Sequence, residues 1–130
     1  MYGVSTKVST GFDETIERVT EALKTEGFGV LSDIDVAATL KSKLGVDHTP
    51  YRILGACNPE FAQKALAAEP DIGVLLPCNF VVREDEAGDV YVLFMNPLAV
   101  LDLVENPQVP GLASVVREKL DRVMDVVKSS

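Results

Sequence analysis

Two Cys-Asn pairs are the residues of this chain whose types best suit chemistry. Cys57 and Asn58 end one apolar run, and Cys78 and Asn79 interrupt another. A thiol can act as a redox centre or as a ligand for a soft metal, and an amide side chain can bind a ligand in a pocket. We therefore treat all four as candidate ligand-binding residues, although Asn58 also fits a helix cap and Asn79 fits a strand residue bonded to backbone or water.

Cys57 comes directly before Asn58 and Pro59, a pairing typical of a helix start. A helix N-terminus favours thiolate, so one hypothesis is a reactive Cys57 with Cys78 as its partner. The hypothesis that we favour is that both are small buried apolar residues, as unpaired cysteines usually are. A disulfide between them requires Cα atoms within about 7 Å, and the sequence does not supply that distance.

Arg52 is the fifth candidate ligand-binding residue. It lies in a predicted strand, where it either pairs with an acidic neighbour, the interpretation that we favour, or anchors an anion in a cleft. A metal site would have to combine His48, Cys57 and Cys78, which are spread singly along the chain without the close pairs of structural zinc sites. We therefore predict no metal and no cofactor, with His48 in an exposed loop.

Composition excludes several classes of function. The 130 residues include 12 basic and 20 acidic side chains, and the net charge of −8 opposes binding to nucleic acid. No basic cluster favours a membrane surface, and the apolar stretch from Ile72 to Val82 is shorter than the roughly 20 residues that span a bilayer. The N-terminus lacks a secretory signal, so we expect a cytoplasmic protein with free thiols.

Enzymatic activity has little support in the sequence. Glycine-rich phosphate loops, HExxH, GxSxG and paired-carboxylate motifs are absent, and the chain has one histidine. We expect a non-catalytic protein, while an enzyme whose substrate carries the chemistry would leave no motif.

Apolar periodicity predicts a single domain over residues 1–130, built as a two-layer α+β sandwich. We expect strands at residues 2–8, 28–36, 51–57, 73–83 and 90–95, with the first strand paired to the second and the last two forming an antiparallel hairpin. Helices are expected to start at Phe12, Val36, Pro59, Pro97 and Leu112. The helix that starts at Phe12 should end at Gly27, and the last helix should turn Leu112, Val115, Leu120, Val123 and Val127 towards the core.

The segments YRILGACNP and LLPCNFVV, in this order, follow an N-terminal strand and helix and precede a hairpin. They resemble the bacterial and archaeal family called domain of unknown function 302, and the similarity extends over nearly the whole chain. The resemblance implies a curved, mainly antiparallel sheet backed by helices, similar in layout to the TATA-box-binding-protein fold, and a homodimer. It implies no known activity, and a shared layout does not transfer DNA binding.

Two functional hypotheses follow. The first is a non-catalytic homodimeric module that binds a small, partly apolar ligand or a protein partner. The alternative is a thiol-dependent redox or soft-metal-binding protein that uses Cys57 and Cys78.

Overall fold

A five-stranded antiparallel sheet in the order β1-β5-β4-β3-β2 forms one layer of the protein. The computed structural model describes residues 1–129. The strands are β1 (Gly3–Val8), β2 (Gly29–Asp35), β3 (Tyr51–Cys57), β4 (Cys78–Glu84) and β5 (Val90–Met95). This sheet, with its helices, confirms the predicted α+β sandwich.

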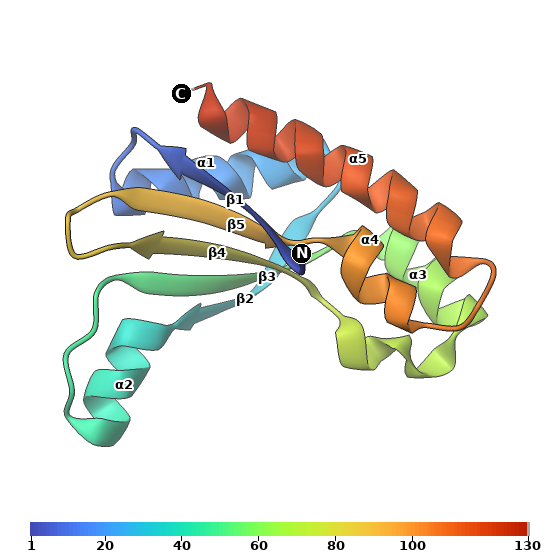
Figure 1. The fold of residues 1–130 in the computed structure, drawn as a ribbon, viewed down its shortest axis with the longest axis horizontal. Helices are drawn as coiled ribbons and strands as arrows, with labels where there is room; N and C mark the ends of the chain where they lie inside the picture. Colours follow the sequence, from blue (N-terminus) through green and yellow to red (C-terminus); the bar gives the residue numbers. More distant parts are fainter. Residues whose placement is uncertain (130) are drawn as a thin grey trace.

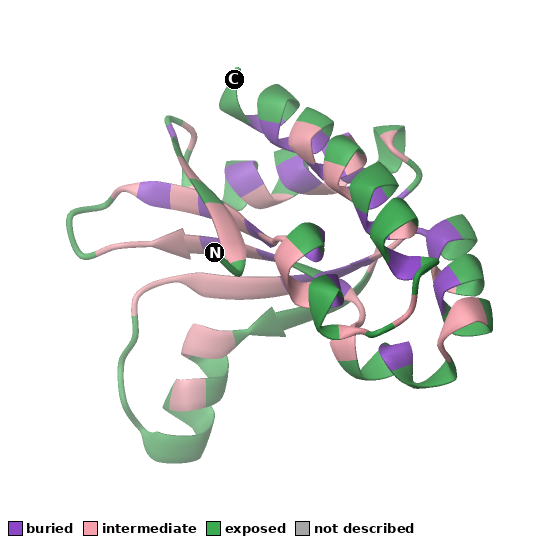
Figure 2. Ribbon diagram, turned by 45° about the vertical axis from the view of Figure 1, so that its right-hand side comes forward, coloured by how far each residue is buried: buried purple, intermediate pink, exposed green. Residues whose placement is uncertain are grey.

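The longer helices form the second layer, which covers one face of the sheet. The helices are α1 (Phe12–Thr25), α2 (Val36–Leu44), α3 (Pro59–Ala68), α4 (Pro97–Val100) and α5 (Val109–Lys128), with short 3₁₀ helices η1 (Pro70–Leu75) and η2 (Leu101–Leu103). Helices α1 and α5 pack against each other on the same face of the sheet, whereas α2 lies apart from both at the β2 edge (Figure 1). No residue of α2 is buried (Figure 2).

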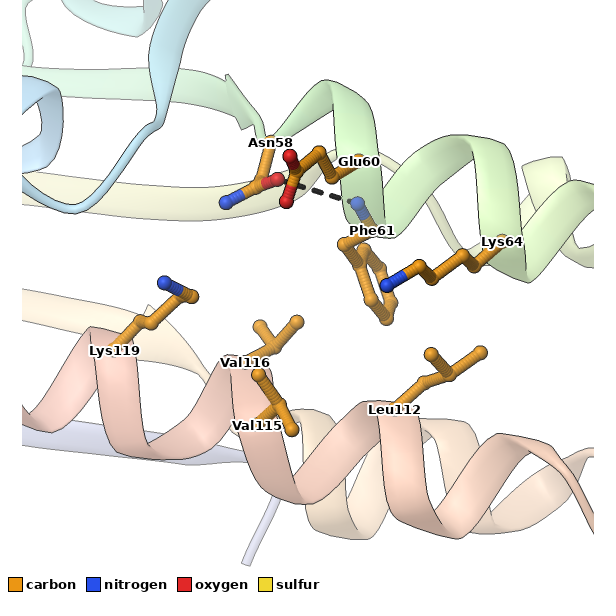
Figure 3. A pocket seen from close by; sticks show the side chains of 8 residues that line it. All are labelled: Asn58, Glu60, Phe61, Lys64, Leu112, Val115, Val116 and Lys119. Carbon is orange, nitrogen blue, oxygen red and sulfur yellow. Dashed lines mark hydrogen bonds between the residues drawn. The ribbon is translucent and has the colours of Figure 1, made fainter.

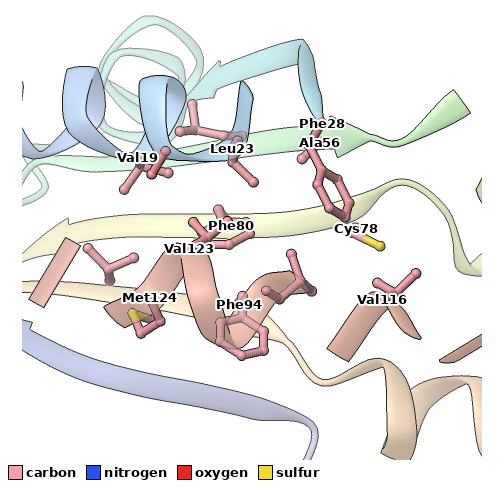
Figure 4. Packing of buried hydrophobic residues seen from close by; sticks show 14 of the residues in the cluster. Val19, Leu23, Phe28, Ala56, Cys78, Phe80, Phe94, Val116, Val123 and Met124 are labelled. Carbon is pink, nitrogen blue, oxygen red and sulfur yellow. The ribbon is translucent and has the colours of Figure 1, made fainter. Parts of the chain in front are cut away.

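The hydrophobic core lies between the sheet and the pair α1 and α5. Phe80 and Phe94 stand opposite each other on β4 and β5, with ring centroids 5.6 Å apart. Leu23 of α1 and Val123 of α5 pack over this part of the sheet (Figure 4) and are fully buried. These contacts fix which face of each central strand points towards the helices.

The opposite face of the sheet has no such cover. Successive side chains of a strand point to opposite faces, so the neighbours of the buried core residues point away from α1 and α5. One row across this face consists of Leu93, Val81, Ile53 and Ile34, which are cross-strand partners on β5, β4, β3 and β2. None of the four is buried, and Ile34 is 50% exposed. We call this row the open-face row.

The local helix signals are confirmed. The Asp35 carboxylate accepts a hydrogen bond of 2.9 Å from the backbone N–H of Ala38, and α2 ends at Gly45. Gly27 follows α1 with φ of +82°, and its N–H donates to the carbonyl of Lys24. These short-range interactions depend on neighbouring residues only, which is why sequence predicts them well.

Two strand predictions were wrong. The first strand pairs with β5 and not with β2, because α1 carries the chain to the other edge of the sheet, where β2 pairs with β3. The expected strand at 73–83 begins only at Cys78, since Pro70–Leu75 forms η1. Pro77, whose peptide bond to Leu76 is cis, has no N–H to donate to a strand ladder and marks the true start.

The last helix also starts earlier than predicted. It begins at Val109, because Pro110 is accommodated in the first turn, where its missing N–H has no intrahelical partner to lose. The buried stripe includes Val116, whereas Val115 is 52% exposed. No helix of residues 1–129 is long and apolar enough to cross a membrane.

Candidate functional site

An apolar cavity of about 440 Å³ lies at one end of the sheet, where the start of β2, the end of β3 and the start of β4 meet α3 and η1. We call it the thiol cavity because both cysteines line it. Its walls are otherwise mainly aliphatic and aromatic, with Leu31, Phe61, Ala62, Leu66, Leu76 and Pro77 among them. The structure thus brings Cys57, Asn58 and Cys78 together, three of the five candidate residues.

The two cysteines reach this cavity from opposite faces of the sheet. Cys78 is the register partner of Ala56, so the side chains of these two residues point to the same, core-facing side. Cys57 is the next residue after Ala56 and points the other way. Both thiols are free, and Cys78 is 3% exposed whereas Cys57 is half-buried. A disulfide would require the end of β3 or the start of β4 to rotate until both side chains lay on the same face of the sheet.

The environment of Cys78 opposes thiolate formation. Burial among core residues, next to Phe28 and Ala56 in Figure 4, raises the pKa of Cys78 to about 12, and the nearby Cys57 adds to this effect. Desolvation penalises the charged form of a thiol because the apolar surroundings cannot replace water. Cys78 is therefore a neutral thiol at physiological pH, with the character of a small polarisable apolar group.

Asn58 links α1, β3 and α3 at the rim of the cavity. Its Oδ1 accepts a hydrogen bond of 3.2 Å from the backbone N–H of Phe61 and caps α3, and its Nδ2 donates over 3.4 Å to the carbonyl oxygen of Glu26. Only 8% of Asn58 is exposed. The amide is thus already engaged at both ends, and its main role is structural.

Gly55 and Ser32 contribute to the site but were missed by sequence analysis. Ser32 is the register partner of Gly55 across a bulge in β2, and it lines the cavity. A Cβ atom at Gly55 would collide with Ser32 Oγ and would lie 2.9 Å from Pro77 Cγ. Because Gly55 has no side chain, Ser32 of β2 and Pro77 can both lie close to the backbone of β3 at this position. The glycine inside the apolar run YRILGAC is the sequence feature that indicates this contact, since a glycine within a strand often marks a place where another part of the chain approaches closely.

Arg52, Asn79 and His48 lie outside the cavity. Arg52 makes a two-pronged ion pair with Asp33, with 2.7 Å between Nε and Oδ1, and this contact lowers the pKa of the Asp33 carboxyl. Asn79 is exposed on the uncovered face of the sheet, beside a shallow hollow of about 310 Å³. His48 is exposed in the loop before β3, and its Nδ1 lies 2.7 Å from the carbonyl oxygen of Thr49.

The metal hypothesis is not supported by this arrangement. His48 precedes β3 and Cys57 ends it, so the length of a strand separates them. Within residues 1–129, no three histidine, cysteine, aspartate or glutamate side chains gather closely enough to hold a metal ion.

A second, smaller hollow of about 90 Å³ lies between α3 and α5. Figure 3 shows the Phe61 ring above Leu112 and Val116, with the side chains of Lys64 and Lys119 extending into the space between the helices. Phe61 lines both hollows and is their common wall. The smaller hollow falls below the size usual for ligand pockets, whereas the thiol cavity is within that range.

Fold and site together define a class of protein: a two-layer α+β sandwich with an apolar, ligand-sized cavity at one end of its sheet. The chain belongs to the family described as domain of unknown function DUF302, whose family model matches residues 4–127.

A solved structure agrees with this assignment over the full length of the chain. It is described as an uncharacterized conserved protein DUF302 from Bacillus stearothermophilus, is 35% identical in sequence, and matches with a TM-score of 0.91. The match covers 98% of each chain. No curated protein matches the chain.

Proposed function

We propose that this protein is a non-catalytic module that binds a small, partly apolar ligand in the thiol cavity and acts as a homodimer. The cavity is the observation that carries the proposal. Its volume of about 440 Å³ lies within the range of roughly 300–1,000 Å³ found for ligand sites, which are mostly apolar.

The elements around the cavity favour a preformed site. Asn58 ties the start of α3 to the end of α1, and Gly55 lets Ser32 and Pro77 approach β3. A site whose walls are held by capping and strand pairing loses little conformational entropy when a ligand enters.

The homodimer is supported by the open-face row. Four cross-strand apolar side chains without a covering layer, Leu93, Val81, Ile53 and Ile34, form a surface that a second copy can cover symmetrically. A test of the homodimer is the solution mass of a Val81→Lys variant, measured by sedimentation. We expect it to be a monomer, while Gln63→Lys, at an exposed position of α3, stays a dimer. An unaltered Val81→Lys dimer would place the interface elsewhere, and a monomeric native protein would exclude the homodimer.

The thiol-dependent alternative has less support from the geometry. A redox pair needs two sulfur atoms that can bond, and Cys57 and Cys78 extend from opposite faces of the sheet. A soft-metal site needs several ligands close together, and within residues 1–129 no three histidine, cysteine, aspartate or glutamate side chains gather closely enough.

Native mass spectrometry of protein purified gently from its own organism tests ligand binding. We expect bound mass that is lost on denaturation, and that is absent from an Ala62→Phe variant, in which a ring occupies the cavity from α3. Ala67→Phe is the matched control, because it makes the same change at an exposed position of the same helix. The proposal would be contradicted by native protein without bound mass, or by equal bound mass in Ala62→Phe and native protein.

A further inference from the structure

The residues that line the thiol cavity favour an uncharged ligand. None of the described residues that line it has a charged side chain. Its polar groups are the Ser32 hydroxyl, the thiols of Cys57 and Cys78, and the Asn58 amide, which already bonds to Phe61 and Glu26. A charged group placed here would lose its hydration without gaining a partner of opposite charge.

The sulfur atoms and the aromatic ring that line the cavity, together with its volume, limit the type and size of the ligand. Cys57 and Cys78 contribute two polarisable sulfur atoms, and Phe61 contributes a ring. Sulfur atoms and aromatic rings both make favourable contacts with aromatic rings. The volume is about three times that of a 150 Å³ cavity that binds benzene, so it has room for a molecule of two or three rings.

We propose that the thiol cavity selects an uncharged aromatic ligand of two or three rings. This inference rests on the proposed ligand-binding function and adds the chemical class of the ligand. Exclusion of anions is strengthened by the net charge of −8, which repels them before they reach the cavity.

Two fluorescent probes with the same ring system test this inference. N-phenylnaphthylamine is uncharged, and anilinonaphthalene sulfonate adds one sulfonate to the same rings. We expect the uncharged probe to bind native protein at least about tenfold more tightly than the sulfonate, because the buried sulfonate has no partner.

Leu66→Lys provides the sharpest variant. Leu66 lines the cavity and is 43% exposed, so a lysine here adds a positive charge at the rim without disturbing the core. We expect the affinity for the sulfonate, relative to that for the uncharged probe, to rise about three- to tenfold, because the added charge pairs with the sulfonate only. Ala62→Phe should abolish binding of the uncharged probe, and Ala67→Phe should leave it unchanged.

The outcomes separate failure of the inference from failure of the proposed function. If both probes bind native protein with equal affinity and Ala62→Phe abolishes both, the cavity binds ligands but does not select against charge, and only the inference is overturned. If Leu66→Lys lowers the affinity for both probes by the same factor, the inference is also overturned. If neither probe binds, or if Ala62→Phe and Ala67→Phe bind alike, then the cavity takes no such ligand, and the inference falls. Bound mass of another kind in the native spectrum would then still support the proposed function.

Discussion

Cys78 offers a direct test of how the core controls thiol chemistry. In a Cys57→Ser variant it is the only thiol, so the rate of alkylation by iodoacetamide reports on this residue alone. Thiolate is the reactive form, and a thiol with a pKa near 9 is about 10% ionised at about pH 8. In the native protein the pKa of Cys78 is raised to about 12, chiefly by burial, which the Cys57→Ser variant retains, and this pKa corresponds to only about 0.01% thiolate. Ionisation alone therefore predicts alkylation about 1,000-fold slower in the folded than in the unfolded protein.

The assay compares the growth of alkylated mass in native buffer with that in guanidinium chloride. Exclusion of the reagent by the core can only add to the expected ratio, since Cys78 is 3% exposed. A ratio below about ten would refute the buried neutral thiol and restore Cys78 as a candidate for redox or metal chemistry.

The same raised pKa has a consequence for stability. The folded protein holds the Cys78 proton more tightly than the unfolded chain, so this group leaves the free energy of unfolding unchanged below about pH 9. As the pH rises from about 9 towards about 12, the free energy of unfolding falls by up to about 1.4 kcal/mol for each pH unit. Cys78→Ala should lack this part of the alkaline slope, measured by denaturant titration at each pH.

Three further predictions concern stability and are measured by denaturant titration with circular dichroism. Asn58→Ala should lower the free energy of unfolding by about 1–2 kcal/mol through loss of the α3 cap, and Asn58→Ser, which retains a capping oxygen, by less; equal losses would refute the capping role. Gly27→Ala should cost about 1–2 kcal/mol because of its φ of +82°, and an unchanged midpoint would contradict the assigned backbone. The contact with Arg52 lowers the pKa of Asp33, so the contribution of this ion pair to the free energy of unfolding, about 1 kcal/mol or less, is present above about pH 4 and is lost as the pH falls further. Between about pH 4 and pH 2, Asp33→Asn should therefore lose less stability than native protein, and parallel curves would count against the ion pair.

Helices and their ends were predictable because their determinants are local. Asn58 and Pro59 mark the start of α3, and Asp35 caps α2, as side chains three residues from their partners do in any helix of this kind. The start of α5 was predicted too late, at Leu112, because a proline such as Pro110 is as compatible with the first turn of a helix as with a break before it.

Strand pairing was less predictable because it depends on contacts between distant residues. Alternation of side chains in β1 places Val4 and Val8 on the side of the core, where the structure has them. It does not indicate which strand pairs with β1. Ile72 illustrates the other difficulty: it is 2% exposed, so its apolar character suits the core equally well from η1 and from a strand.

The candidate site was only partly predictable. The unusual Cys-Asn pairs led to Cys57, Asn58 and Cys78, which line one cavity, but the same pattern included Asn79, which lies on the uncovered face. Which of two adjacent strand residues faces a cavity depends on register, and register cannot be derived from residue types alone. The bulge in β2 that brings Ser32 to the cavity is equally invisible in the sequence.

The sheet register also explains why two cysteines can meet in one cavity without forming a redox pair. Pairing of Ala56 with Cys78 commits the Cys78 side chain to the core, and the alternation of β3 then sends Cys57 to the other face. The end of the sheet is the place where side chains from both faces can line a common space, because no further strand residue separates them. Ligand contact there requires only that each sulfur reach the cavity, whereas disulfide formation requires the two sulfurs to reach each other. The arrangement therefore favours two separate soft contacts with one ligand over a bond between the thiols.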